Sequence, residues 1–431
     1  MIQKFICMTF ILLITAFSPI AVSAAGEDVG SLQKQIDSLK KDFSDMKSFY
    51  EQRIQDLEQQ VNELKATGPA ETERAAEAAP EFFTSVPSPV SPGGISQTTN
   101  PDISVVGDFL GIIDQDGNKE FNMHEVELGF QGRVDPFAKA DFFIGMHNEE
   151  GELHTHVEEG YITLLEPPDF LRLPSSAQLK IGKFKAAMGK SNRQHQHYLP
   201  YIDRPAVTEN FLGEEGLAES GVSLSTLIPN PSNRFINLEM EVLNGFSEEH
   251  HEEGGGEGAS SRTMKDWLYL AHITDFHEFN DNTTLEAGFS AATARCPISH
   301  RRTSIESFDF TYRWKPLEAS DYKSFWWMTE FFLAQKDGET SGENHAFGLY
   351  SAATHQISRK TFLGLRYDYS EYPDNPSNRD SGYSAFVNFF QSEFARYTLQ
   401  YKHIDKNYAE DDDTIMFQLN FNIGPHGAHP Y

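Results

Sequence analysis

The stretch TIMFQLNFNI, residues 414–423, alternates between apolar and polar side chains. In an extended strand, successive side chains point to opposite faces. One face would carry Ile415, Phe417, Leu419, Phe421 and Ile423, and the other would carry Thr414, Gln418, Asn420 and Asn422. The pattern therefore predicts a strand that separates an apolar environment from an aqueous one.

The same alternation recurs along the chain from Asp102 onward, most clearly in SFDFTYRW (307–314) and INLEMEVL (236–243). Strands of nine to twelve residues suit a tilted crossing of a bilayer, whereas the strands of a soluble sandwich average five or six. We therefore predict an all-β fold, a 16-stranded antiparallel transmembrane β-barrel. The sixteen runs are 103–113, 121–133, 137–147, 155–165, 177–185, 220–228, 234–245, 265–275, 283–293, 304–315, 324–335, 345–357, 361–370, 382–391, 394–404 and 413–423.

The connections between these runs alternate between long or polar segments and generally shorter ones. NEEGELH (148–154) and residues 186–219 belong to the first group, and FHEFNDN (276–282) belongs to the second. Transmembrane barrels place long loops outside the cell and tight turns in the periplasm. An even strand number also places both ends of the barrel in the periplasm.

Three segments precede the predicted barrel, which occupies 102–431. Residues 1–24 have the Lys4, apolar core and small-residue cleavage pattern of a signal peptide. Residues 31–65 carry a heptad stripe of apolar positions with one stutter, which predicts an α-helical periplasmic coiled coil. A single amphipathic helix docked on a domain is the alternative. Residues 66–101 are rich in Pro, Ala, Ser and Gly and are interpreted as a flexible linker.

Composition excludes several classes of function. Asp and Glu number 64 against 35 Lys and Arg, giving a formal net charge of −29, so nucleic-acid binding through a basic surface is not expected. Cys296 is the one cysteine left after signal removal, so no intrachain disulfide forms. The sequence contains no nucleophile elbow, phosphate-binding glycine loop or HExxH motif, and we expect no enzyme.

The signal, coiled coil, sixteen alternating runs and long third loop resemble those of bacterial outer-membrane porins. The likeness is nearer to the phosphate-selective porin O/P-type proteins, which carry a periplasmic coiled coil before a sixteen-stranded barrel. It implies a passive diffusion channel, a homotrimer and a third loop folded inward. Two features depart from that family: the barrel is acidic rather than lined by Arg and Lys, and the terminal aromatic, Tyr431, follows Ile423 by eight residues. Acidic, His-rich barrels also look like proteins labelled zinc-regulated outer-membrane receptors.

The third long connection, residues 186–219, is far longer than a hairpin requires, and loops of that length are usually functional or disordered. Its aromatic residues and prolines argue against disorder. We predict that it forms the pore constriction, where both signs of charge create a transverse field. The alternative is a loop that covers the mouth with solvated charges. The constriction residues are Arg193, His195, His197, Arg204, Glu209, Glu214 and Glu215.

Histidines beside carboxylates form a second signal, in segments interpreted as loops. His154 and His156 lie two residues apart and would project to one side of an extended chain, which suits shared coordination of zinc. His250 and His251 are flanked by glutamates. The alternative is that these acidic loops are simply hydrated. No cofactor is expected apart from zinc at these four histidines.

The sequence thus predicts an outer-membrane porin with a water-filled channel for small solutes or ions. Its partners would be outer-membrane lipid and two further copies of the chain, and its coiled coil would lie in the periplasm. Acidic inward positions such as Glu125, Glu127 and Glu239 predict a cation preference that weakens at high salt. The alternative hypothesis is a metal-uptake or metal-scavenging protein of the outer membrane that uses its His/Glu-rich loops.

Overall fold

The computed structural model describes residues 101–424, apart from 116, 118, 150–151, 233, 247–262, 298, 321 and 339–341. The predicted signal peptide (1–24), the predicted coiled coil (31–65) and residues 66–100 of the predicted linker lie outside the described residues. His250 and His251 lie outside them as well.

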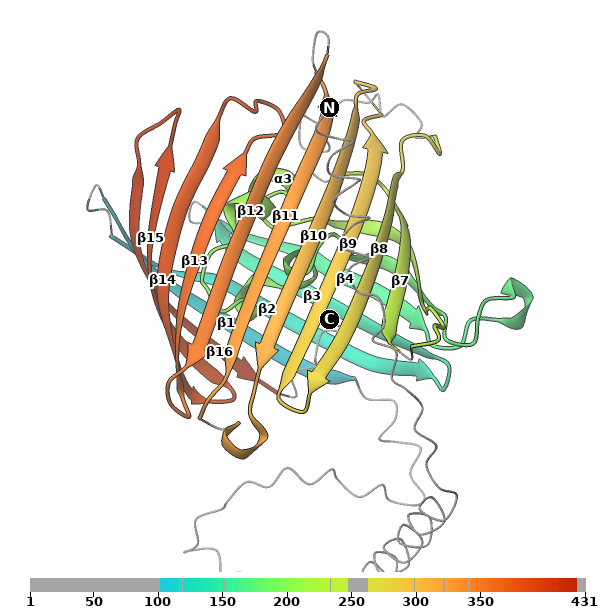
Figure 1. Ribbon diagram of the computed structural model, residues 1–431, viewed down its shortest axis with the longest axis horizontal. Helices are drawn as coiled ribbons and strands as arrows, with labels where there is room; N and C mark the ends of the chain where they lie inside the picture. Colours follow the sequence, from blue (N-terminus) through green and yellow to red (C-terminus); the bar gives the residue numbers. More distant parts are fainter. Residues whose placement is uncertain are drawn as a thin grey trace, which may run out of the picture. The chain divides into compact units, whose positions relative to one another are not determined.

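The described chain forms a closed barrel of sixteen antiparallel strands (Figure 1). Each strand pairs with its neighbours in sequence, and β16 closes the barrel against β1. The prediction of an all-β, sixteen-stranded antiparallel barrel is confirmed. In the described ranges, no helix combines the length and the apolar character needed to span a membrane.

The first eight strands are β1 (Asp102–Asp114), β2 (Lys119–Asp135), β3 (Ala138–Glu149), β4 (Glu152–Leu164), β5 (Gln178–Lys185), β6 (Ala218–Leu227), β7 (Phe235–Leu243) and β8 (Leu268–Asn280). The others are β9 (Thr283–Arg295), β10 (Arg302–Trp314), β11 (Phe325–Asp337), β12 (Glu343–Gln356), β13 (Thr361–Glu371), β14 (Arg379–Ser392), β15 (Ala395–Lys406) and β16 (Asp412–Ile423). Every predicted run overlaps one of these strands.

Several strands run longer than predicted, because hairpin pairing continues through polar residues. β2 has 17 residues. β3 and β4 pair as far as Glu149 and Glu152, so the predicted loop 148–154 is reduced to residues 150–151. β8 likewise extends through most of FHEFNDN, leaving residues 281–282 between β8 and β9. The predicted difference in length between the connections at the two ends of the barrel therefore depends mainly on two long connections, residues 186–217 and 244–267. The connection 165–177, on the side predicted to have short turns, is long and contains η1 (Asp169–Leu171).

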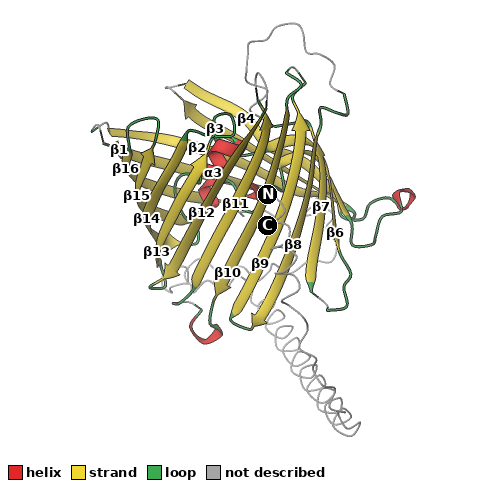
Figure 2. Cartoon of the chain, turned by 45° about the horizontal axis from the view of Figure 1, so that its top comes forward, coloured by secondary structure: helices red, strands yellow, loops and turns green. Residues whose placement is uncertain are grey.

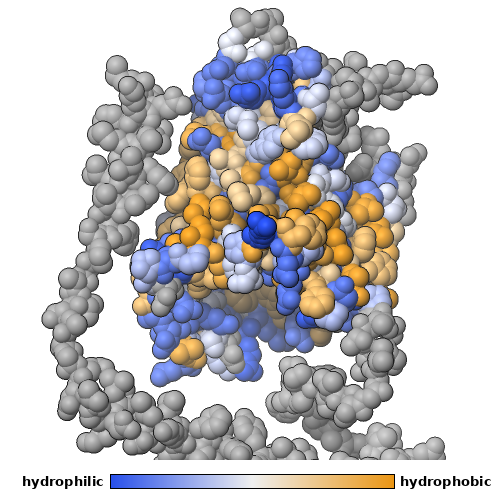
Figure 3. All heavy atoms as spheres, turned by 90° about the vertical axis from the view of Figure 1, so that its right-hand side faces the viewer, coloured by the Kyte–Doolittle hydropathy of each residue, from blue (hydrophilic) through white to orange (hydrophobic). Residues whose placement is uncertain are grey.

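The barrel reverses the usual polarity of a protein, with apolar side chains outside and polar side chains inside. In the closing strand β16, Ile415 and Phe417 are 47% and 43% exposed, whereas Gln418 is 1% exposed. In β10, Ser307 and Asp309 are likewise buried. Figure 3 shows an apolar band between polar rims on the face that it presents. This arrangement fits a lipid bilayer around an aqueous lumen.

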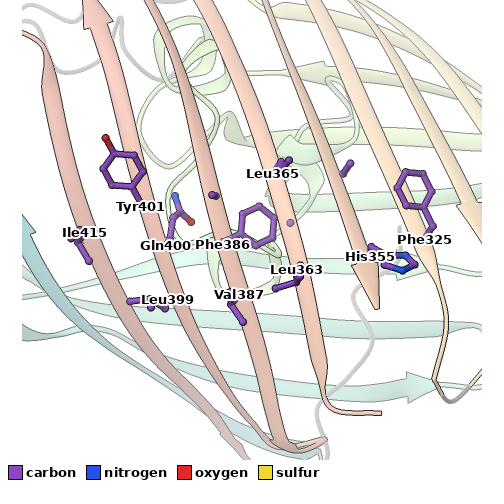
Figure 4. Close-up of a pocket in the computed structure, with 13 residues that line it drawn as sticks. Phe325, His355, Leu363, Leu365, Phe386, Val387, Leu399, Gln400, Tyr401 and Ile415 are labelled. Atoms are coloured by element: carbon purple, nitrogen blue, oxygen red, sulfur yellow. The ribbon is translucent and has the colours of Figure 1, made fainter. Parts of the chain in front are cut away.

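The outer wall over β11–β16 is strongly apolar. A shallow hollow there is lined by outward side chains including Leu363, Leu365, Val387 and Leu399 (Figure 4). Leu365 is 66% exposed and pairs with alanines of both neighbouring strands, Ala353 and Ala385. Such a surface is stable in contact with lipid hydrocarbon rather than water.

Residues 186–217, which join β5 to β6 and are called the lumenal loop below, fold into the interior of the barrel. The loop contains η2 (Ser191–Arg193), η3 (Gln196–Tyr198) and α3 (Ala206–Leu212). Figure 2 shows α3 enclosed by the strands. Apolar loop residues pack on inward wall residues; the Phe211 and Phe332 rings lie 6.0 Å apart and those of Tyr201 and Phe386 also lie 6.0 Å apart. Another short helical turn, η5 (Leu317–Ala319), joins β10 to β11.

The bilayer orientation of the outer wall predicts a position-dependent cost of charge. Leu365→Arg places a guanidinium near the middle of the apolar wall and should lower the free energy of unfolding in lipid vesicles by about 2–4 kcal/mol. Leu317→Arg, in the turn between β10 and β11, is the matched control and should change it by less than about 0.5 kcal/mol. Urea titrations of the refolded barrel measure both values. Equal effects of the two substitutions would contradict the assigned lipid face.

Candidate functional site in the barrel lumen

The lumenal loop is attached to inward side chains around the wall. These side chains accept hydrogen bonds from loop backbone N–H groups, which would otherwise be buried without partners. The bonds run from Ala187 to Glu241 of β7 (3.1 Å), from Gly189 to Ser290 of β9 (3.0 Å), from Ser191 to Glu330 of β11 (2.7 Å), from Ala206 to Asp368 of β13 (3.3 Å) and from Ile202 to Gln400 of β15 (2.8 Å).

One charged network joins the loop to β13 and β15. The Arg366 guanidinium donates to the Asp203 carboxylate at 2.9 Å and to the Asp368 carboxylate at 2.6 Å. Lys402 Nζ lies 3.4 Å from Asp203 Oδ2. Burial opposes ionisation, but the charges of Arg366 and Lys402 outweigh it and lower the pKa of Asp203 to about 2. The loop is therefore held here by charge-assisted hydrogen bonds.

Two loop cations pair with carboxylates on another part of the wall. Lys190 Nζ donates to Glu286 Oε1 at 2.6 Å, and Arg193 Nη2 donates to Glu239 Oε2 at 3.1 Å. Arg204 is buried, and its Nη2 donates to the Gln194 carbonyl at 3.3 Å. Both signs of charge thus face wall groups along the loop.

His195 lies at the centre of a third group, between the loop and β2 and β4. Its Nδ1 is 2.8 Å from Glu127 Oε2 and 2.7 Å from Glu158 Oε2, and its Nε2 is 2.7 Å from Glu159 Oε1. Burial disfavours a charged ring, but the bonds and charges of these glutamates raise the pKa of His195 well above its usual value. His195 is therefore an imidazolium between three carboxylates. His197 Nδ1 lies 3.6 Å from Glu125 Oε2 beside it.

Two β-bulges supply part of this acidic wall. The β1–β2 register passes from Asp108–Glu125 to Phe109–Met123, which leaves His124 as an extra residue. The β3–β4 register passes from Phe143–Glu159 to Ile144–Val157, which leaves Glu158 as an extra residue. A bulge re-aims side chains near functional sites. Here it allows consecutive residues, Glu158 and Glu159, both to contact His195.

A histidine pair adjoins this group on β3 and β4. The rings of His147 and His156 are stacked, with centroids 4.8 Å apart and an interplanar angle of 14°. His147 Nε2 lies 3.6 Å from Glu158 Oε1, and His156 Nε2 lies 3.5 Å from Glu215 Oε2 at the end of the lumenal loop. His147, His156 and Glu158 are partly exposed and Glu215 is exposed, whereas His195 and His197 are buried.

The structure places most predicted constriction residues in the lumen. Arg193, His195, His197, Arg204 and Glu209 are enclosed by the barrel, whereas Glu214 and Glu215 are exposed at the end of the loop.

Of the predicted metal ligands His154 and His156, the loop prediction is wrong for His154, whereas His156 falls within the predicted run 155–165. Both lie in β4, because the β3–β4 hairpin continues almost to its tip. His156 stacks on His147, while His154 is exposed. His250 and His251 lie outside the described residues.

Sequence reasoning missed the partners of His195, namely Glu158 and Glu159, and the bulged His124. A signal was present in HTHVEEGYITL, residues 154–164. His154, His156 and Glu158 follow one phase of the alternation, and Glu159, Tyr161 and Thr163 follow the other. Two adjacent glutamates at a change of phase indicate a bulge that turns both toward the lumen.

The sequence matches no protein-family model. It is 29% identical over 348 residues to an uncharacterized protein of Aquifex aeolicus (strain VF5), an alignment that covers 72% of this chain and 70% of that protein.

Solved structures with a similar fold are outer-membrane proteins, and each comparison covers 75% of this chain. A loop L8 deletion mutant of OmpT from Vibrio cholerae matches with a TM-score of 0.50, 10% identity and 99% of its chain covered. An anion-selective porin from Comamonas acidovorans matches with a TM-score of 0.50 and 9% identity, and 100% of its chain is covered. The outer membrane channel DcaP of Acinetobacter baumannii matches with a TM-score of 0.50 and 12% identity, and 96% of its chain is covered. This chain therefore shares the barrel fold of these proteins.

The network around Arg366 predicts strong coupling between wall and loop. Arg366→Met leaves Asp203 and Asp368 without their main cation and should lower the free energy of unfolding by about 3 kcal/mol. Adding Asp203→Asn should recover part of that loss, because the two residues are in contact. Arg313→Met, at an exposed inward arginine, is the control and should cost less than about 0.5 kcal/mol. Additive effects of the Asp203 and Arg366 substitutions in urea unfolding would contradict the coupling.

Proposed function

We propose that this chain is an outer-membrane porin, a water-filled diffusion channel for small solutes or ions that the lumenal loop narrows. The observation that carries the proposal is the attachment of this loop to inward side chains of β7, β9, β11, β13 and β15. A sixteen-stranded barrel is too wide for wall side chains alone to fill. A loop held across it restricts passage without closing the barrel at its ends.

The charges of the lumen support a cation preference. The buried charged residues of the wall and the lumenal loop are mostly acidic, and a negative potential concentrates cations and repels anions. The acidic ones are Asp108, Glu125, Glu127, Asp141, Glu159, Glu239, Glu241, Asp309, Glu330, Asp368 and Asp380, and the basic ones are Lys185, Lys190, Arg204, Arg366 and Arg396.

Acidic and basic groups occupy different parts of the lumen. His195 and the carboxylates around it lie against β2 and β4. A hollow between the loop and β10–β15 is lined instead by Arg313 and Arg396, with Tyr198 and Pro200 on the loop side. A solute in this hollow would meet a transverse field, which discriminates by charge and dipole orientation.

A homotrimer is the proposed assembly, and it rests on the resemblance to porins. Outer-membrane lipid would contact the apolar band of each barrel, and the N-terminal coiled coil would lie in the periplasm. Insertion of one trimer into a planar bilayer should then produce three conductance steps.

Ion selectivity tests the proposal directly. In a potassium chloride gradient centred near about 0.1 M, the reversal potential of the purified protein should show modest cation preference. Near about 1 M salt the preference should fade, because the screening length falls from about 10 Å to about 3 Å. Absence of conductance from folded protein would refute the channel. Anion preference at low salt would refute the assigned selectivity and favour a phosphate-type channel.

The selectivity should also depend on pH through Glu209 of α3. Burial and the charge of Asp203 raise the pKa of Glu209 to about 7, against the opposing charges of Lys402, Arg366 and Arg204. The carboxyl is neutral below that pH and negative above it. Cation preference should therefore increase from about pH 6 to about pH 8.

The effect of Glu209 is separable from that of the lumenal histidines by substitution. Glu209→Gln should remove its part of the pH response while leaving the histidine part. Glu214→Gln, at an exposed position of the same loop, should retain the full response. Identical pH profiles of the reversal potential for Glu209→Gln and the unmodified protein would contradict the role of Glu209.

A further inference from the structure

We propose that His147, His156, Glu158 and Glu215 form a binding site for a divalent cation of the zinc class inside the lumen. Two ligands lie on the paired strands β3 and β4, one is the bulged residue of β4, and one belongs to the lumenal loop. The proposal goes beyond a diffusion channel, because it assigns a specific ligand to one part of the wall. It does not depend on the channel conducting.

Three ligand atoms already converge. One ligand atom each from His147, His156 and Glu158 lies within 4.8 Å of the other two. Zinc lies about 2.0–2.2 Å from its nitrogen and oxygen ligands, so the three ligand atoms must be somewhat closer to one another than 4.8 Å when zinc is bound. Small side-chain rotations bring them to that separation. Glu215 Oε2, at 3.5 Å from His156 Nε2, is placed to close it as a fourth ligand.

The converging atoms are buried, and no hydrogen bond satisfies them. In the described part of the chain, His147 Nε2, His156 Nε2 and Glu158 Oε1 each lack a hydrogen-bond partner. Buried polar atoms normally have such partners, and exceptions point to a bound ion or water. Glu158 Oε2 is separately engaged by His195, which orients the carboxylate and leaves Oε1 directed at His147.

Gly145 of β3 provides the space between these atoms. A Cβ at this position would lie 2.1 Å from Glu158 Oε1 and 2.8 Å from His147 Nε2. Any other residue would therefore push these ligands away. Gly145 therefore leaves the room in which Glu158 Oε1 and His147 Nε2 face each other.

The donor set identifies the class of cation. Two imidazoles and two carboxylates in a tetrahedral arrangement suit zinc, whereas calcium and magnesium prefer six or more oxygen ligands. The neighbouring set Glu127, His195 and His197 is fully buried, and three glutamates already hold His195. His147, His156 and Glu158 are partly exposed residues although the three ligand atoms themselves are buried, so a cation reaches the site from the lumen after small side-chain rotations. Binding would tie the end of the loop to the wall through Glu215.

Calorimetric titration of zinc chloride into the purified full-length protein tests the site. His250→Ala and His251→Ala are introduced first, so that this His-rich segment does not contribute. This background protein should bind one zinc per chain. His147→Ala and, separately, His156→Ala should each weaken zinc binding by about tenfold or more. Each substitution removes a direct ligand, and even the loss of a residue that only orients a ligand typically lowers metal affinity by about tenfold.

Two glycine variants provide a matched comparison that retains every ligand. Gly145→Ala should weaken zinc binding by at least about tenfold, because its methyl group displaces Glu158 Oε1. Gly129→Ala introduces a methyl group against Ser104 Oγ and the Phe143 ring, with none of the four ligands among its nearest atoms, and should leave binding unchanged. His154→Ala, at an exposed histidine of the same strand, should also have no effect. Heat-modifiable gel mobility verifies that each variant is folded.

The outcomes separate this inference from the proposed channel. Zinc affinity that is unchanged in both His147→Ala and Gly145→Ala would overturn the site, as would the absence of zinc binding by a background protein that still conducts ions. Zinc binding by folded protein that conducts no ions would refute the channel and leave the site standing. A tenfold loss in His147→Ala, His156→Ala and Gly145→Ala, but not in Gly129→Ala, supports the site.

Discussion

Closure of the sheet between β1 and β16 is the constraint on which the rest of the structure depends. An open sheet edge in lipid leaves backbone groups without hydrogen-bond partners, each at a cost of several kcal/mol. β16 pairs with β1 from Ile423 to Thr414, and on the inner face Gln418 Nε2 donates to Asp108 Oδ2 at 2.9 Å across the same seam. Closure gives the barrel an outer face, which must be apolar in lipid, and an inner face, which can carry charged side chains.

The lumenal loop follows from that polar interior. A long segment of irregular backbone can be buried only where its N–H and C=O groups find partners. Inward carboxylates and amides of the wall supply them, as Glu330 does for Ser191 and Gln400 does for Ile202. The polar inner face thus both faces water and anchors a segment that narrows the lumen.

The sequence could predict the barrel because every strand repeats one local rule, and all sixteen runs correspond to strands. It also predicted that the third connection is unusual and that Arg193 and His195 belong to it. It could not predict the neighbours of His195, because they depend on the path of the loop and on single-residue bulges. Period-two reasoning assigns Glu158 to the face opposite Glu159, and one extra residue in β4 reverses that assignment.

Apolar packing and the acidic cluster occupy different parts of the lumen, and this separation bears on what the cluster does. Tyr201, Val207 and Phe211 hold the loop against inward residues such as Phe332 and Tyr350. The Asp203–Arg366 pair also holds the loop to β13, whereas His195 holds it to β2 and β4 through Glu127 and Glu159. Carboxylates gathered at close range repel one another, and the imidazolium of His195 offsets that repulsion at Glu127, Glu158 and Glu159. The acidic cluster therefore attaches the loop to β2 and β4 by charge, as the apolar contacts attach it to β11 and β12.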